Sequence, residues 1–383
     1  MVTPAGRVVA LALACALTGC SGASSTSQPS PATSSSGATA SSQDWVALER
    51  SIDAYLDEAD PPGLANVRAV LVSVDGSTVV AHHRDSAPDE TAHVWSVTKS
   101  VLSMLVGIAI ADGHLRGLDQ SLAELLPAYR AHLRADTASI TLQQLLSMTS
   151  GITDGPEAGM HFDPADPDIV RTILDRPLVA APGTKWLYSN ASAHLVSAAL
   201  RHATGQSVLD YARTRLFDPL GIRTRPAYEG VEEFASIAVF SEEFRRAGFA
   251  WGTDRQGVHV GGLMLKLTAP DMIKLGELHL AQGSWHGRRI VPAEWVTTSI
   301  TPVELATQDD GSSYGLMWWL FELDGHQAYA ASGGSGQGHV HDVLIVPDRR
   351  LVVVRSSRDD VSLPLEVGML APLLTDVILP AVD

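Results

Sequence analysis

The stretch SVTKSVLSMLVGIAIA, residues 96–111, is apolar on nearly every side after its first turn. A helix without a polar face belongs in the middle of a domain, because none of its sides favours contact with water. Asp112 and Gly113 follow the stretch and end the helix. We therefore predict a buried central helix, around which the remaining elements have to be arranged.

Strand-like patterns lie on both sides of this helix along the chain. Residues 67–83 predict two strands joined at Asp75-Gly76, a dipeptide that favours a tight hairpin turn. The pattern becomes strand-like again only near the other end, over residues 329–331, 340–346 and 351–355. We therefore expect one antiparallel sheet built from both ends of the chain.

Helical patterns fill the part between the strands, and each ends at or near a glycine. Three of them cover residues 140–152, 189–205 and 269–283. Strands at both ends with helices between them predict the α/β (α+β) class. The expected architecture is the antiparallel sheet, flanked by helices, with a mainly helical insertion at residues 115–250.

The first 43 residues have a different composition from the rest. Residues 1–20 begin with a positive Arg7, continue with an apolar run and end in LTGC, which is the layout of a secretory signal peptide. The ending resembles a bacterial lipobox, which implies removal of the signal before Cys20 and a lipid anchor on that cysteine. Secretion with Cys20 as a free thiol is the alternative. Residues 21–43 are rich in Ser, Ala and Thr and predict a disordered linker, so the folded domain covers residues 44–383.

The overall composition excludes some kinds of partner. The 383 residues are 45% hydrophobic and carry a net charge of −16, which describes a globular protein with a large core. A nucleic-acid binder needs a basic face, so no nucleic-acid partner is expected. The predicted location is extracytoplasmic, with the membrane as a partner through the lipid anchor.

Ser96 and Lys99 at the start of the apolar helix are the first candidates for chemistry. Positions i and i+3 share a helix face, so the two side chains can meet. A serine hydroxyl needs an adjacent base to act as a nucleophile, and a buried lysine has a lowered pKa that lets it exchange protons. The alternative is a polar helix start with no function, but Lys99 would then be buried without partners.

Tyr188 and Asn190 form the second candidate group, between a Pro-Gly turn and a helix start. A tyrosine beside a lysine can act as a base for a serine, because a nearby positive charge favours the phenolate. An asparagine two residues further on can orient the lysine or the substrate. On its own this pattern is weak, since most such tyrosines are packing residues.

The third candidate is the glycine-rich stretch ASGGSGQGHVHD, residues 331–342. A substrate can lie against such a backbone, and the N–H of Ser335 is a candidate oxyanion donor. Within this stretch His339, His341 and Asp342 form an H-x-H-D pattern. No third metal ligand is evident from the sequence, so we predict no metal site.

Taken in this order, these motifs resemble the serine β-lactamase and penicillin-recognising superfamily. They are most similar to its class C β-lactamase-like branch of esterases, D-aminopeptidases and 6-aminohexanoate-dimer hydrolases. SVTK matches the Ser-x-x-Lys motif and YSN takes the second place. Further similarity covers residues 145–152, 182–190, 261–296 and 314–319, so the resemblance spans nearly the whole folded domain.

The resemblance implies a fold and a mechanism. The fold is β-lactamase/transpeptidase-like, and no cofactor is needed. Ser96 is implied as the acylated nucleophile, Lys99 and Tyr188 as the proton-transfer pair, and Asn190 as a helper. The oxyanion and substrate contacts fall on Ser332, Gly333, Gly334 and Ser335.

The third motif departs from the family's Lys-Thr-Gly, whose lysine holds a substrate carboxylate. Counting back from Val346-Pro347 places that motif on residues 332–334, where a serine replaces the cation. A hydroxyl offers no charge to a carboxylate. We therefore predict a serine hydrolase for a small-molecule ester or amide. The alternatives are a β-lactamase or DD-peptidase-type penicillin-binding protein, and a non-catalytic membrane-tethered binding protein.

Overall fold

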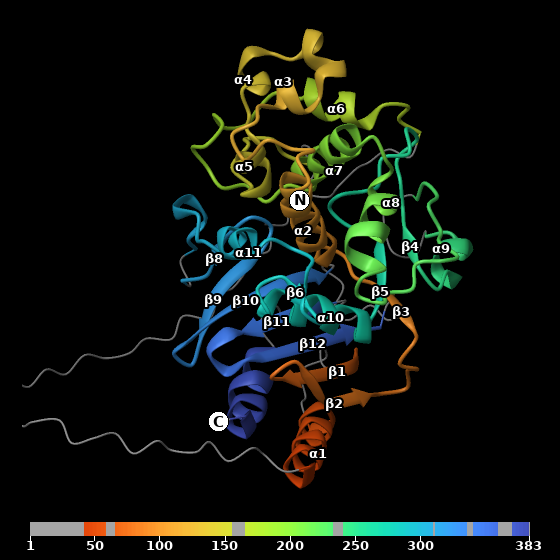
Figure 1. Ribbon diagram of the computed structural model, residues 1–383, viewed down its shortest axis with the longest axis vertical. Helices are drawn as coiled ribbons and strands as arrows, with labels where there is room; N and C mark the ends of the chain where they lie inside the picture. Colours follow the sequence, from red (N-terminus) through yellow and green to blue (C-terminus); the bar gives the residue numbers. More distant parts are fainter. Residues whose placement is uncertain are drawn as a thin grey trace, which may run out of the picture.

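The computed structural model (Figure 1) describes residues 42–58, 66–154, 165–232, 240–308, 311–334, 340–358 and 370–382. The predicted signal peptide and nearly all of the predicted linker lie outside these ranges. Within them, no helix combines the length and the apolar character that crossing a bilayer requires.

A seven-stranded sheet forms the base of the molecule. Its spatial order is β2-β1-β12-β11-β10-β9-β8, and every neighbouring pair is antiparallel. The first strand of the chain, β1, therefore pairs with the last, β12, which confirms the sheet predicted from both ends. The strands are β1 (Val67–Val74), β2 (Ser77–His83), β8 (Ser313–Tyr314), β9 (Trp319–Leu323), β10 (His326–Gly334), β11 (Val340–Val346) and β12 (Leu351–Ser357).

The hairpin between β1 and β2 turns at the predicted dipeptide. Asp75 and Gly76 both have positive φ, 52° and 74°, as a two-residue turn with the twist of the strands requires. Val74 pairs with Ser77 directly across this turn. Short β8 and β9 were not predicted, because the Trp-rich sequence around them has no clear alternation.

Helices cover both faces of the sheet. One face carries α1 (Ser42–Glu58) and the C-terminal helical segment, residues 370–382, which also contact each other (Figure 1). The other face carries α2 (Val97–Ala111) and α10 (Ala269–Leu280). The side chains of β10 alternate accordingly: Tyr329 and Ala331 join the core around α2, whereas Ala328 and Ala330 join the core under α1.

Helix α2 is buried along nearly its whole length, as predicted, and ends at Asp112 with Gly113 in the left-handed region. Gly107 in its middle faces the indole of Trp295 on α11 (Ala293–Ser299). A Cβ at Gly107 would lie 2.2 Å from that ring. The missing side chain therefore lets α11 pack directly onto α2.

The insertion is mainly helical, as predicted, and lies on the far side of α2 from the sheet (Figure 1). Its predicted helix over residues 140–152 is too long, because the observed helix ends at Leu146. Met148 has a φ of 61°, and its carbonyl accepts the N–H of Leu187 at 2.8 Å. The chain thus leaves the helix to run past the start of α7. The insertion helices are α3 (Leu122–Leu125), α4 (Ala135–Ala138), α5 (Leu142–Leu146), α6 (Ile169–Asp175), α7 (Asn190–Thr204), α8 (Val208–Ala212) and α9 (Glu242–Arg246).

A second, three-stranded sheet positions the start of α2. Its order is β3 (Thr91–His93), β5 (Leu265–Thr268) and β4 (Ala250–Trp251). The pairing continues past β3, since the N–H of Val94 donates to the carbonyl of Leu265 at 2.9 Å. This sheet was not predicted, and it holds the backbone immediately before Ser96.

Candidate active site

Ser96 lies at the N-terminal end of α2, where its side chain is partly exposed. Lys99 lies one turn further on and is 1% exposed. The Lys99 Nζ donates to Ser96 Oγ at 2.8 Å. The i, i+3 spacing therefore brings the hydroxyl and the amine together as expected, with the hydroxyl towards solvent and the amine beneath it.

Lys99 has two further acceptors, both from distant parts of the chain. Its Nζ donates to Asn190 Oδ1 at 2.5 Å and to the carbonyl of Gly262 at 2.7 Å. Burial lowers the pKa of Lys99 to about 7, and the negative charge of Asp154 acts in the opposite direction. Near neutral pH the amine can therefore both accept and give up a proton.

Tyr188 lies against the same two residues. The Lys99 Nζ is 4.8 Å from the centroid of its ring, and its hydroxyl interacts with that of Ser96. Burial raises the pKa of Tyr188 well above its ordinary value, and the charge of Asp154 adds to the effect. Tyr188 is therefore a neutral phenol at ordinary pH, which does not favour the phenolate base that the sequence suggested.

Asp154 lies on the loop after α5, and its carboxylate meets the start of α7. It accepts hydrogen bonds from the Ser189 hydroxyl at 3.1 Å, the Asn190 amide at 2.9 Å and the Ala191 N–H at 2.8 Å. The loop therefore reaches the site. His161, on the same loop, lies outside the described residues.

The end of β10 passes the nucleophile closely. A Cβ built on Gly333 would lie 2.4 Å from the backbone nitrogen of Ser96 and 2.3 Å from the carbonyl of Val94. Only a glycine lets the strand approach this far. Gly334 follows and is exposed, whereas Ser335 lies outside the described residues.

Ser96, Lys99, Tyr188 and Asn190 lie together and are called the Ser96 group below. Ser332 is not part of this group. Its hydroxyl donates to Asp342 at 2.6 Å, and that carboxylate pairs with Arg355, which donates to it at 2.8 Å through Nε. Strand alternation places Ala331 and Gly333 on the α2 face and Ser332 on the opposite one. Of the predicted third-motif residues, Gly333 therefore faces Ser96 and Ser332 does not.

The residues of the H-x-H-D pattern do not meet at one site. His341 is buried and lies 3.3 Å from the Ser356 hydroxyl, whereas Asp342 belongs to the pair with Arg355. His339 lies outside the described residues. Among the residues placed in the structure, no three His, Cys, Asp or Glu side chains gather as metal ligands would.

Aromatic rings pack beside Tyr188. Trp319 stacks on it at 5.9 Å between centroids, and Trp186 and Tyr314 contact both rings edge-on or tilted. Trp186, Tyr188 and Trp319 are only partly buried. The rings of these three residues form an apolar wall beside the Tyr188 hydroxyl. Trp318, in contrast, is fully buried in the core.

Sequence reasoning missed two contributors to this site. Gly262 was included in the similarity but given no role, and the only signal was its place in a Gly-Gly pair before an apolar strand. A Cβ at Gly262 would lie 2.7 Å from Asn190 Oδ1, so the glycine lets its carbonyl reach Lys99. Asp154 is the second, and no motif identified in the sequence includes it.

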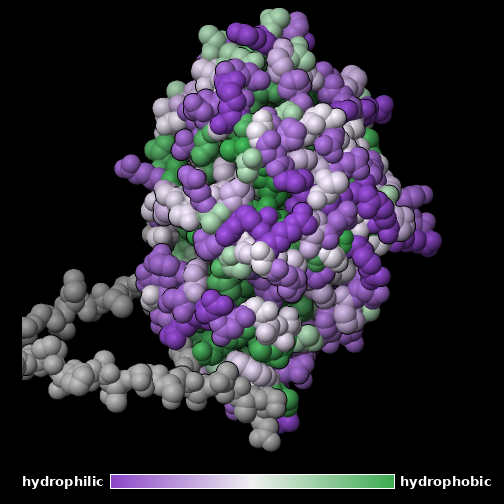
Figure 2. Space-filling model, in the orientation of Figure 1, coloured by the Kyte–Doolittle hydropathy of each residue, from purple (hydrophilic) through white to green (hydrophobic). Residues whose placement is uncertain are grey.

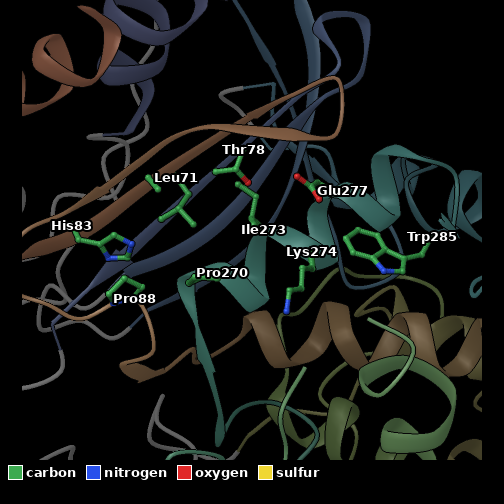
Figure 3. Close-up of a pocket in the computed structure, with 10 residues that line it drawn as sticks. Leu71, Thr78, His83, Pro88, Pro270, Ile273, Lys274, Glu277 and Trp285 are labelled. Atoms are coloured by element: carbon green, nitrogen blue, oxygen red, sulfur yellow. The ribbon is translucent and has the colours of Figure 1, made fainter. Parts of the chain in front are cut away.

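A separate pocket of about 440 Å³ lies between the β1–β2 hairpin and α10 (Figure 3). Leu71 and Ile273 form part of its apolar wall, and Glu277 and Lys274 line it from α10. No member of the Ser96 group lines it. The face seen in Figure 2 is mostly polar, with apolar residues in recesses between polar side chains.

The family comparison gives one match across most of the chain. The model of the family described as Beta-lactamase matches residues 48–369. Among curated proteins, Penicillin-binding protein 4 of Amycolatopsis lactamdurans is 25% identical over 365 residues, which cover 87% of this chain and 90% of that protein. The match therefore extends beyond the motifs to most of the described fold.

Solved structures with the same fold include two hydrolases. EstCE1, a hydrolase with promiscuous acyltransferase activity, superposes with a TM-score of 0.66 at 18% identity and covers 89% of this chain and 99% of its own. A D-stereospecific amidohydrolase from Streptomyces sp. gives a TM-score of 0.62 at 18% identity, with 86% and 97% covered. These likenesses confirm the predicted β-lactamase/transpeptidase-like fold.

Proposed function

The chain belongs to the β-lactamase family and is a serine hydrolase, and from this premise we propose that it cleaves an ester or amide through an acyl-enzyme on Ser96. One observation carries the proposal. The Ser96 hydroxyl accepts a hydrogen bond from a buried amine, Lys99, which lies against the ring of a phenol, Tyr188. A non-catalytic binding protein has no need to bury a lysine in this way.

The pKa directions divide the proton-transfer work between the pair. Lys99, with its pKa lowered to about 7, is substantially neutral near pH 7 and accepts the proton of Ser96. Tyr188, with its pKa raised by burial, keeps its proton and relays one towards the leaving group. Asn190 and Gly262 hold the amine in place through its other hydrogen bonds.

The reaction then runs in two halves. Ser96 Oγ attacks the carbonyl carbon, its proton passes to Lys99, and the carbonyl electron pair moves onto oxygen. Collapse of this intermediate breaks the bond to the alcohol or amine, which leaves with a proton delivered from Lys99 by way of Tyr188. Water then attacks the acyl-enzyme and gives a proton to Lys99, and the acid is released as Lys99 passes that proton to Ser96 Oγ.

Backbone N–H groups are the proposed stabilisers of the oxyanion. Ser96 supplies one at the N-terminal end of α2, where the helix leaves N–H groups without internal partners. The close approach of Gly333 to Ser96 brings the backbone of Gly334 to the same side, and Ser335 is the next residue along the chain. One of these two residues is the proposed second donor.

The substrate proposed is a neutral acyl ester or amide. Residues 326–346, from β10 to the end of β11, contain no lysine or arginine, so no residue of this stretch can supply the cation of the family motif. A substrate carboxylate would therefore lack a charged partner on this strand. The aromatic wall of Trp186, Tyr188 and Trp319 suits an apolar group instead.

Turnover of two chromogenic substrates by the purified protein tests this proposal. We expect measurable hydrolysis of p-nitrophenyl butyrate that falls as the pH drops below about 7, because protonated Lys99 cannot act as a base. The nitrocefin carboxylate would lack a charged partner, and a lost charge-assisted hydrogen bond is worth about 1.5–3 kcal/mol. We therefore expect nitrocefin to react roughly 10- to 100-fold less efficiently than the neutral p-nitrophenyl ester.

Either substrate can contradict the proposal. Efficient nitrocefin hydrolysis without butyrate turnover would favour a β-lactamase, the function closer to the name of the Amycolatopsis relative. Turnover of neither substrate, at any pH from 5 to 9, would favour the binding protein.

A further inference from the structure

The structure assigns Asp154 a positioning role in the proposed reaction: its carboxylate orients the Asn190 amide and, through that amide, fixes Lys99 against Ser96. This inference rests on the proposed function and deepens it. The contacts that support it join Asp154 on the loop after α5 to the start of α7, and the start of α7 to Lys99.

Both carboxylate oxygens of Asp154 are engaged. Oδ1 accepts from the Ser189 hydroxyl and the Ala191 N–H, and Oδ2 accepts from the Asn190 Nδ2. A helix N-cap alone does not require this arrangement, because Ser189 already caps α7 by accepting the Ser192 N–H at 3.1 Å. The bond to the Asn190 side chain is additional to capping.

That bond decides which way the Asn190 amide faces. An ionised carboxylate only accepts, so the donor end of the amide has to face Asp154. The acceptor end, Oδ1, is then left 2.5 Å from the Lys99 Nζ. An ammonium can only donate, so this orientation stabilises the protonated form of Lys99 at the position where it also contacts Ser96 Oγ.

The charge of Asp154 also favours the protonated form of Lys99. It opposes the effect of burial on the pKa of Lys99, and it adds to the effect of burial on the pKa of Tyr188. Two phenols also lie close by: Tyr188 itself and Tyr314, whose pKa burial also raises. Without Asp154, the pKa of Lys99 should fall further.

Three variants of the full-length protein separate this role from simple capping. Asp154→Asn removes the charge and turns the Asn190 amide around. Asp154→Asn combined with Asn190→Asp exchanges the two groups, so that a carboxylate contacts Lys99 directly. Asp168→Asn is the matched control, since Asp168 caps α6 through the Arg171 N–H and contacts none of the Ser96 group.

The readout is the pH dependence of the rate at which a fluorophosphonate labels Ser96, together with the melting temperature. For Asp154→Asn we expect labelling about 10-fold slower at its maximum, with the midpoint of the acid limb about one pH unit lower than in the wild type. The exchange variant should have its midpoint above that of the wild type. Asp168→Asn should lower the melting temperature and leave the midpoint unchanged.

Two outcomes would overturn the inference. One is an Asp154→Asn midpoint equal to that of the wild type, which would leave Asp154 as a cap only. The other applies if Asp154→Asn does not fold: an exchange variant whose midpoint equals that of the wild type would also overturn the inference. A wild-type protein that is not labelled at Ser96 at any pH refutes the proposed function itself, so the two failures are distinguishable.

Discussion

Replacing Lys99 by methionine is expected to lower kcat/KM for p-nitrophenyl butyrate by about a thousandfold, within the range that a general base contributes. Methionine fills much of the same buried space but cannot accept the proton of Ser96. Whatever activity remains should also lose its fall below pH 7, because the group with the pKa of about 7 is gone. Steady-state kinetics from pH 5 to 9 measure both effects.

Lys266→Met is the matched control for this variant. Lys266 is also a buried lysine, but its Nζ donates to the carbonyls of Phe244, Arg245 and Ala247 at the end of α9. Its loss should lower the melting temperature and leave the acid limb in place. A Lys99→Met protein that keeps a tenth or more of the wild-type kcat/KM would refute the role of Lys99 as the base.

Gly333→Ala is expected to damage both activity and stability. The added Cβ would overlap the backbone of Val94 and Ser96, and backbone cannot turn aside as a flexible side chain can. Overpacking of this kind costs about 1–3 kcal/mol. Displacement of the strand relative to the nucleophile by about 1 Å should lower kcat/KM roughly a hundredfold.

A second crowded glycine provides the comparison. Gly276 on α10 faces the same sheet, and a Cβ there would lie 2.4 Å from Val352 Cγ1 and 2.7 Å from Val343 Cγ1, which are side-chain methyl groups and not the backbone at Ser96. Urea unfolding should show Gly276→Ala destabilised to a similar degree, with nearly normal kcat/KM in the folded protein. Equal losses of activity in both variants would show that Gly333 matters only for packing.

Much of the framework could be predicted from the sequence because its signals are local. The apolar stretch after Ser96 predicted a buried helix, and the Asp75-Gly76 turn predicted the hairpin at the edge of the sheet. The Ser96–Lys99 contact follows from helix geometry alone. These features depend on residues that are neighbours along the chain.

The remaining parts of the site depend on contacts between distant segments. The carbonyl that accepts from Lys99 belongs to Gly262, 163 positions away, and no local pattern points to it. The register of the third motif depends on strand alternation, which a run of small residues such as 331–334 does not reveal. In the structure, Gly333 faces Ser96 and the Ser332 hydroxyl faces Asp342.

Mass-spectrometric mapping of the fluorophosphonate adduct tests the central claim most directly. We expect a single modified residue, Ser96, in the wild-type protein near pH 8, and no adduct in a folded Ser96→Ala variant. An adduct on a different serine, or equal labelling of wild type and Ser96→Ala, would contradict it.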